Sequence, residues 1–186
     1  MKRQNPNPRK HEHNSMTAEP TDGGLVERAR TGDAKALTEL FRRYAPQVYE
    51  VAMRLTRSRH DAEDVTQNVF IGLPEALGGY SGAGELGAWI RRIGTRAALL
   101  LMRQERRQGK WERRAARESA DSEARLALDE ALAALPEDWR VVFVLKEVEG
   151  YSHDEIADFL GISPSLSSVR LHRARRFLQD RLGDEI

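Results

Sequence analysis

Apolar residues in the first half of the chain recur at intervals of three and four, which is the spacing of one helix face. The first such stripe consists of Leu37, Leu40, Phe41, Tyr44, Val48, Val51, Ala52 and Leu55. It predicts an amphipathic helix, with Pro46 as a candidate kink. A second helix is expected from about His60 through Val65, Val69, Phe70 and Leu73, and Pro74 should shorten or bend its end.

A glycine-rich segment, residues 78–84, interrupts the pattern and predicts a loop, because glycine removes the preference for regular structure. A third helix should begin at Glu85 or Leu86 and run to about Arg107. Its expected buried residues are Trp89, Ile90, Ile93, Ala97, Leu100 and Leu101. The arginines of this segment then fall on its outer face.

Two helical units are predicted, because residues 104–124 are charged and almost free of large apolar side chains. The expected organisation is a disordered leader over residues 1–22, a first domain over 23–107, a linker over 108–124 and a second domain over 125–186. The second domain opens with a helix over residues 126–135, continues after Pro136 and stops at Gly150. No convincing strand alternation or repeat occurs, so the expected fold class is all-α.

Residues 152–178 carry the most specific signal, a helix-turn-helix. Ser152 can cap a first helix that ends at Gly161, and Ser163 can cap a second helix with Pro164 at its first position. On the second helix one face carries hydroxyls, a valine and cations: Ser165, Ser168, Val169, His172, Arg173 and Arg176. These side chains suit base edges and phosphates in a major groove. The alternative is an ordinary helical hairpin with a solvated basic face.

Composition narrows the function classes further. The net charge is only +1, but residues 60–90 hold five acids and no Lys or Arg, whereas residues 91–117 hold ten basic residues and two acids. Such alternation indicates separate surfaces for separate partners. The absence of cysteine excludes disulfides and thiol chemistry, and the polar start and lack of a long apolar run favour a cytoplasmic location.

No enzyme is indicated, since the sequence offers no nucleophile arrangement, metal cluster or phosphate loop. His11, Glu12 and His13 lie in the predicted leader, where solvent exposure is more common than metal binding. No cofactor or small-molecule substrate is expected.

The segment LDEALAALPEDWRVVFVLKEVEGYSHDEIADFLGIS, followed by RLHRARRFL, resembles the upstream-element-binding domain of bacterial RNA polymerase sigma factors of the extracytoplasmic-function type. The motifs DAEDVTQNVF and AWIRRIG resemble the core-binding and promoter-melting domain of the same family. The resemblance covers about residues 24–182. It implies a sigma factor that binds core RNA polymerase and promoter DNA.

The resemblance also implies roles for particular residues. Asp61, Glu63, Asp64 and Gln67 match the motif that docks on a basic coiled coil of the polymerase, and Asn68 stands where the family usually has Glu. Acids at a helix start are also ordinary partners of the helix dipole, so a plain surface role is the alternative.

For the downstream promoter element, the resemblance implies base capture by the glycine-rich loop, through Tyr80 and Ser81. A plain flexible loop is the alternative. Arg91, Arg92 and Arg96 would face phosphates of the opening duplex, with Arg96 at a usual Asn position, and Trp89 is expected in the core.

The recognition helix departs from the family at Ser167, where a buried Val is usual, and at Ser168, where Lys is usual; Leu166 is expected to repack nearby. The promoter sequence therefore does not follow from relatives. The resemblance further implies an anti-sigma factor as a partner. A stand-alone DNA-binding regulator is the alternative function, and the acidic helix is the feature that such a regulator would not need.

Overall fold

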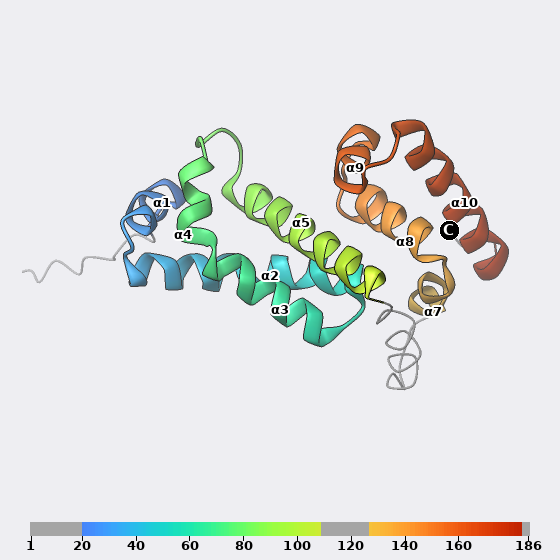
Figure 1. The fold of residues 1–186 in the computed structure, drawn as a ribbon, viewed down its shortest axis with the longest axis horizontal. Helices are drawn as coiled ribbons and strands as arrows, with labels where there is room; N and C mark the ends of the chain where they lie inside the picture. Colours follow the sequence, from blue (N-terminus) through green and yellow to red (C-terminus); the bar gives the residue numbers. More distant parts are fainter. Residues whose placement is uncertain (1–19, 109–126, 184–186) are drawn as a thin grey trace, which may run out of the picture.

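The computed structural model describes residues 20–108 and 127–183, and within these ranges the chain forms helices without strands, as the all-α prediction requires (Figure 1). The first unit comprises α1 (Asp22–Arg30), α2 (Ala34–Thr56), α3 (Arg59–Ile71), α4 (Leu73–Ala76), the short 3₁₀ helix η1 (Leu77–Gly79) and α5 (Leu86–Arg107). The second comprises α7 (Ala127–Ala134), α8 (Glu137–Phe143), the π-helical turn η2 (Val144–Val148), α9 (His153–Leu160) and α10 (Pro164–Leu182). The predicted linker lies mostly outside the described residues, as does the predicted leader apart from its last three positions.

The core of the first unit lies where α2, α3 and α5 pack together. The helix α2 continues through Pro46, and α3 begins directly after Ser58, whose side chain accepts a hydrogen bond from the Asp61 N–H. At the crossing of α2 and α5 a Cβ placed on Gly94 would lie 2.9 Å from Val48 Cγ1. Glycine therefore permits this close approach of the two helices.

The predicted burial of α5 was wrong at Leu100, which is 51% exposed, whereas its neighbour Leu99 is 4% exposed. The buried stripe instead passes through Ile90, Gly94 and Ala98, at intervals of four. Large side chains dominated the prediction, but small residues mark the true contact line because they let α5 approach α2 closely.

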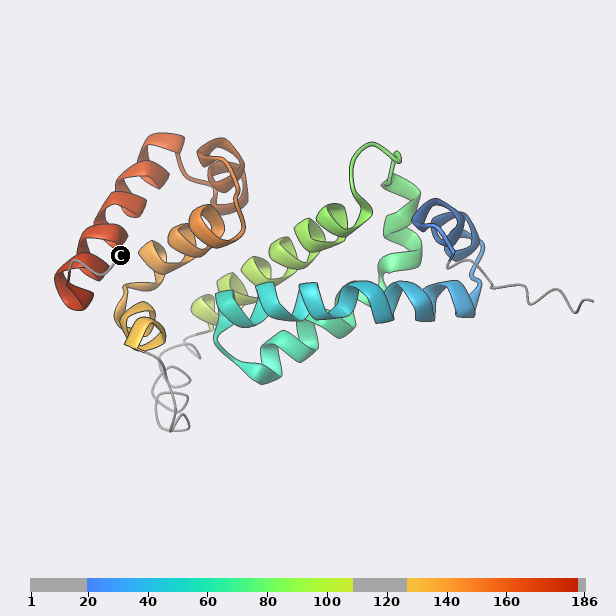
Figure 2. The ribbon, with the colours of Figure 1, turned by 180° about the vertical axis from the view of Figure 1, so that it is seen from behind.

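The helix α1 was not predicted as a separate element. It buries Leu25, Val26 and Ala29 against the rest of the first unit and lies beside α4 and η1 (Figures 1 and 2). The capping Thr21 precedes it, and Asp22 occupies its first turn, where the helix dipole favours an acid.

The helix-turn-helix prediction is confirmed in its details. Ser152 forms a capping box with Glu155, and Gly161 ends α9 in the left-handed conformation at φ 66°. Ser163 caps α10 and Pro164 occupies its first turn.

The two units lie against each other along α5 (Figure 2). Their largest apolar cluster is continuous, since Ile156 and Phe159 of α9 belong to the same group of buried residues as the α5 core. Arg140 of α8 is 4% exposed and donates hydrogen bonds to the carbonyls of Arg54 and Leu55 at 3.1 and 2.9 Å. These carbonyls belong to the last turn of α2, where cations are favoured.

Candidate nucleic-acid and protein interfaces

The recognition face of α10 is exposed along its whole length. Its members are those expected from the sequence: Ser165, Ser168, Val169, His172, Arg173 and Arg176. The opposite side is buried through Leu171, Ala174 and Leu178. The structure thus brings the six residues together on one accessible helix surface, as a major-groove reader requires.

A hydrogen bond between the two helices of the motif explains the unusual serine at position 167. Ser167 is fully buried, and its Oγ lies 2.9 Å from His153 Nδ1 at the start of α9. A buried hydroxyl is tolerated when it is paired, so His153 compensates for the serine. The expected repacking of Leu166 is not observed: this residue is 40% exposed.

The acids of α3 fall into two groups. Asp61 is 3% exposed and lies in the first turn, whereas the side chains of Glu63 and Asp64 are 44% and 47% exposed. Gln67 is exposed on the same helix. We define the acidic face as Glu63, Asp64 and Gln67, the three accessible members of the predicted set.

An apolar groove adjoins the acidic face. It has a volume of about 390 Å³ and is lined by Leu37, Thr38, Phe41, Gln67, Phe70, Ile71 and Leu73. Phe41 and Phe70 meet edge to face at 5.0 Å, and Ile71 is 77% exposed. Exposed apolar side chains beside charged ones are typical of protein-docking surfaces.

The glycine-rich loop, residues 78–85, is organised around Tyr80. Its hydroxyl donates to the Gly84 carbonyl at 2.8 Å, and its ring lies 5.1 Å from that of Trp89. Ser81 is exposed, and its Oγ accepts a hydrogen bond from the Ala83 N–H at 3.3 Å. Tyr80 and Trp89 thus pack together, and Ser81 is the more accessible of the two predicted base-contacting residues.

Arginines of α5 face the second unit in this arrangement. Arg92 Nη1 lies 2.5 Å from Glu155 Oε1, and the guanidinium groups of Arg92 and Arg96 lie 4.9 and 5.5 Å from the centre of the Phe159 ring. Arg91 Nε lies 3.8 Å from Glu149 Oε2. The three arginines predicted to contact phosphates are therefore partly covered by residues of the second unit.

Sequence reasoning missed Glu149, which is 2% exposed through its side chain and also accepts a hydrogen bond from Arg54 Nη1 at 2.9 Å. The pKa of Glu155 is held below its usual value by the Ser152 N–H and by Arg92. Charge pairs between distant segments leave no local signal, and the sign alternation along the chain predicted surfaces for separate partners instead of these contacts within the chain.

No group of three or more metal-binding side chains occurs in the described ranges, and His11, Glu12 and His13 lie outside them. Among the helices of residues 20–108 and 127–183, none is long and apolar enough to cross a bilayer.

Comparison with protein families now assigns the two units to a class. Residues 40–108 match the family of sigma-70 region 2, and residues 125–178 match sigma-70 region 4. The fold and the matches define a sigma factor of the sigma-70 class with these two regions, and sigma factors are transcription initiation factors and not catalysts.

Individual relatives narrow the class further. The chain is 34% identical to the ECF RNA polymerase sigma factor SigE of Mycolicibacterium smegmatis, over 88% of this chain and 68% of that protein. It is 33% identical to the RNA polymerase sigma factor CarQ of Myxococcus xanthus, over 86% and 96%. In fold it is similar to the sigma factor RpoE of Bartonella quintana in complex with the anti-sigma factor NepR, with a TM-score of 0.57, 20% identity and coverage of 82% and 100%. The chain belongs to the ECF RNA polymerase sigma factor family.

Proposed function

We propose that this chain binds core RNA polymerase and directs it to specific promoters, with the phosphodiester chemistry left to the polymerase. The observation that carries the proposal is the pairing, in one chain, of an exposed recognition face on α10 with an acidic face on α3. Residues 23–107 would serve as region 2, 108–124 as a linker and 125–186 as region 4. Because its partner polymerase is cytoplasmic, we place the protein in the cytoplasm.

The recognition face suits the upstream promoter element. Ser165, Ser168 and His172 can exchange hydrogen bonds with base edges, and Val169 can contact a thymine methyl group. Arg173 and Arg176 can hold phosphates, which sets the register of the helix on the duplex. Polymerase-bound sigma would thus read the duplex from one helix.

The acidic face and the adjoining apolar groove suit the polymerase. Glu63 and Asp64 pair within α3 with the exposed Arg59 and His60, at 2.8 and 3.5 Å, and can exchange these partners for basic groups of the polymerase. The groove beside Gln67 offers apolar contact area. A stand-alone DNA-binding regulator would gain nothing from negative charge on an exposed helix, since phosphates repel it.

The downstream element would be read by the glycine-rich loop through Tyr80 and Ser81, with Arg91, Arg92 and Arg96 on nearby phosphates. In the arrangement seen here these arginines contact α9 and Glu149. Promoter opening therefore requires the second unit to leave α5. An anti-sigma factor is the expected regulator, and the structural relative RpoE was captured with one.

Run-off transcription with purified core polymerase and a library of fragments from the source genome tests the function directly. We expect defined transcripts that appear only when the chain is added. No stimulation of any promoter, with a chain that is folded by circular dichroism, would refute the proposal.

Charge reversal on α3 separates the proposal from a stand-alone regulator. The reversed pair should be Glu63→Lys with Asp64→Lys, because Asp61 is buried and its reversal would disturb the fold. We expect polymerase binding to fall at least about tenfold while duplex binding by α10 is not reduced, since close charge pairs at interfaces contribute more than about 1.5 kcal/mol. Unchanged polymerase affinity would favour the regulator.

A further inference from the structure

Arg30, the last residue of α1, reaches across to the glycine-rich loop. Its Nε and Nη2 donate to the Leu77 carbonyl at 3.1 and 3.0 Å, and Nη2 also donates to the Tyr80 carbonyl at 2.5 Å. The guanidinium group thus bridges the two carbonyls on either side of Gly78 and Gly79. On its other edge, Nη1 donates to Glu27 Oε1 at 2.8 Å, which orients the group.

The two contacts differ in what they can stabilise. Leu77 is fully buried and the contact to its carbonyl is partly buried, so a donor there contributes to the fold. The contact to the Tyr80 carbonyl is exposed, and water would satisfy that carbonyl equally well. The effect of the second contact is therefore mainly to fix where Tyr80 and Ser81 lie.

Fixing this backbone matters because the loop is rich in glycine. Gly82 and Gly84 have φ of 78° and 86°, a conformation that other residues rarely adopt, and Gly78 and Gly79 have open space around them. Such a segment loses much conformational entropy when it holds a ligand. A contact that orders it beforehand lowers this cost of binding.

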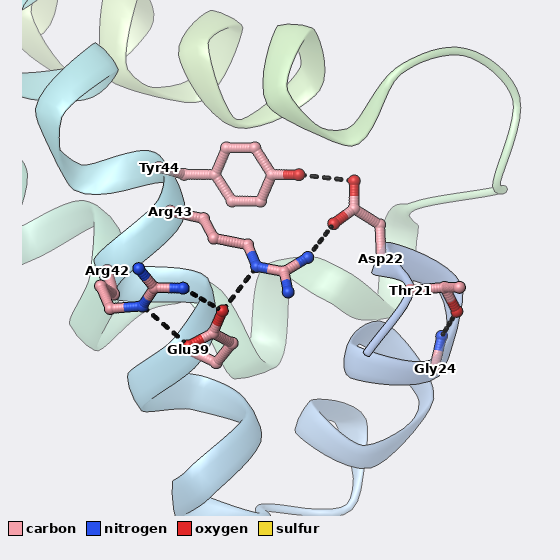
Figure 3. A network of polar contacts seen from close by, with 7 residues as sticks. All are labelled: Thr21, Asp22, Gly24, Glu39, Arg42, Arg43 and Tyr44. Atoms are coloured by element: carbon pink, nitrogen blue, oxygen red, sulfur yellow. Dashed lines mark hydrogen bonds and ion pairs between the residues drawn. The ribbon is translucent and has the colours of Figure 1, made fainter. Parts of the chain in front are cut away.

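The first residue of α1, Asp22, binds side chains of α2 (Figure 3). Tyr44 donates to Asp22 Oδ2 at 2.5 Å, and Arg43 Nη1 lies 3.2 Å from Asp22 Oδ1. The Glu39 carboxylate accepts hydrogen bonds from Arg42 and Arg43, and these bonds lower its pKa to about 2. The Tyr44 ring also packs on α5, since a Cβ on Gly87 would lie 3.0 Å from it. Arg30 therefore acts from a helix whose start is fixed to α2, and α2 in turn packs on the start of α5 through Tyr44.

We propose that Arg30 is a positioning residue for downstream-element recognition: its fork holds the backbone of the glycine-rich loop so that Tyr80 and Ser81 meet the extruded base in place. The inference rests on the proposed function of this loop. The helix α1 would then contribute to promoter recognition indirectly, through the loop that Arg30 holds in place.

The test compares Arg30→Lys with the matched variant Arg28→Lys in reconstituted holoenzyme. Lysine keeps the charge but ends in a single nitrogen, so the separate donors that hold the Arg30 group in place, Nε on the Leu77 carbonyl and Nη1 on Glu27, are lost. Arg28 lies on the same helix, is about half exposed and pairs with the nearby Asp33 at 2.8 Å, so its variant controls for a lost arginine on α1. The probes are a single-stranded oligonucleotide carrying the downstream element of a promoter mapped by run-off transcription, and a duplex carrying only the upstream element.

For Arg30→Lys we expect affinity for the single strand to fall about tenfold, with affinity for the upstream duplex and for core polymerase within about twofold of the unmodified chain. Arg28→Lys should leave all three affinities unchanged. Equal single-strand binding by Arg30→Lys and the unmodified chain would overturn the inference, as would a parallel loss of upstream binding, which indicates general unfolding. If the unmodified chain stimulates no transcription, the proposed function itself fails; normal initiation with an insensitive Arg30→Lys refutes the positioning role alone.

Discussion

Replacing Glu149 with glutamine should open the two units. This carboxylate is 2% exposed and lies between Arg54 Nη1 at 2.9 Å and Arg91 Nε at 3.8 Å. Glutamine keeps the shape and removes the charge, so two cations would remain beside a neutral group. Separation of the units lets both arginines regain water, and the lost attraction therefore appears as an increase in the open form.

The size of the effect follows from the exposure of the partners. Breaking a fully buried ion pair by removing one partner costs about 3–5 kcal/mol. Here Arg54 and Arg91 are 42% and 39% exposed, so solvent screens part of the attraction. An expected loss of about 2–3 kcal/mol corresponds to roughly a 30- to 150-fold increase in the ratio of open to closed chains, at 1.4 kcal/mol for each factor of ten.

Energy transfer between two dyes measures this opening. The chain has no cysteine, so labels can be attached at Asn68→Cys on α3 and Gln179→Cys on α10, both exposed positions. Glu147→Gln is the matched control, because Glu147 pairs with Arg175 at 2.7 Å within the second unit. Equal transfer efficiency in Glu149→Gln and the parent chain would refute the reasoning, as would an equal change in Glu147→Gln.

Three further outcomes can be measured by simpler means. His153→Ala should lower the free energy of unfolding of the second unit by about 1–3 kcal/mol, because Ser167 then lacks its partner, and adding Ser167→Val should recover most of the loss in thermal melts. Gly94→Ala should destabilise the first unit by about 1–3 kcal/mol in urea titration, since the new methyl group meets Val48. Hydrogen bonds from the Ser152 N–H and from Arg92 hold the pKa of Glu155 below its ordinary value, so the stabilisation that ionised Glu155 gives to the closed arrangement is present above the ordinary carboxyl pKa and is lost as the pH falls through the lowered pKa. In dye-labelled Glu155→Gln this acid-dependent opening should be absent.

Local signals gave the helix-turn-helix correctly because its ends are determined by single residues. Ser152, Gly161 and Ser163 each satisfy backbone groups of the nearest helix end, and their positions are sufficient to place α9 and α10. The bounds of α5 were likewise predictable, since the glycine-rich loop fixes its start.

The missed features depend on contacts between distant segments. The nine residues of α1 bury only three side chains, and two glycines weaken the helical pattern at its start. Its stability comes from docking on the first unit, which no local pattern reveals. The same holds for Glu149, a charged residue whose burial follows from two arginines almost sixty and one hundred residues away.

Within the candidate site, the sequence placed the six residues of the recognition face on one surface and the arginines of α5 on another, but it could not show what those arginines contact. Asp61 is a second example, because a charge in a first turn looks the same whether the turn faces solvent or the core. Burial separates it from Glu63 and Asp64. Polymerase binding therefore stays a prediction for the accessible residues of α3, which are Glu63, Asp64 and Gln67.

The arginines of α5 tie the closed arrangement to promoter binding through one chemical property. Glu149 and Glu155 offer carboxylate oxygens to Arg91 and Arg92, and DNA offers phosphate oxygens to the same groups. Replacement of one anion by the other exchanges similar interactions, so the arginines need not lose a partner when the units separate on promoter DNA. The new contacts of the arginines with phosphates then offset most of the free energy of opening. The part that is not offset is the loss of the apolar contact between α9 and α5. Weakening the carboxylate side alone, as in Glu149→Gln, should therefore raise affinity for single-stranded DNA without touching any residue that binds it.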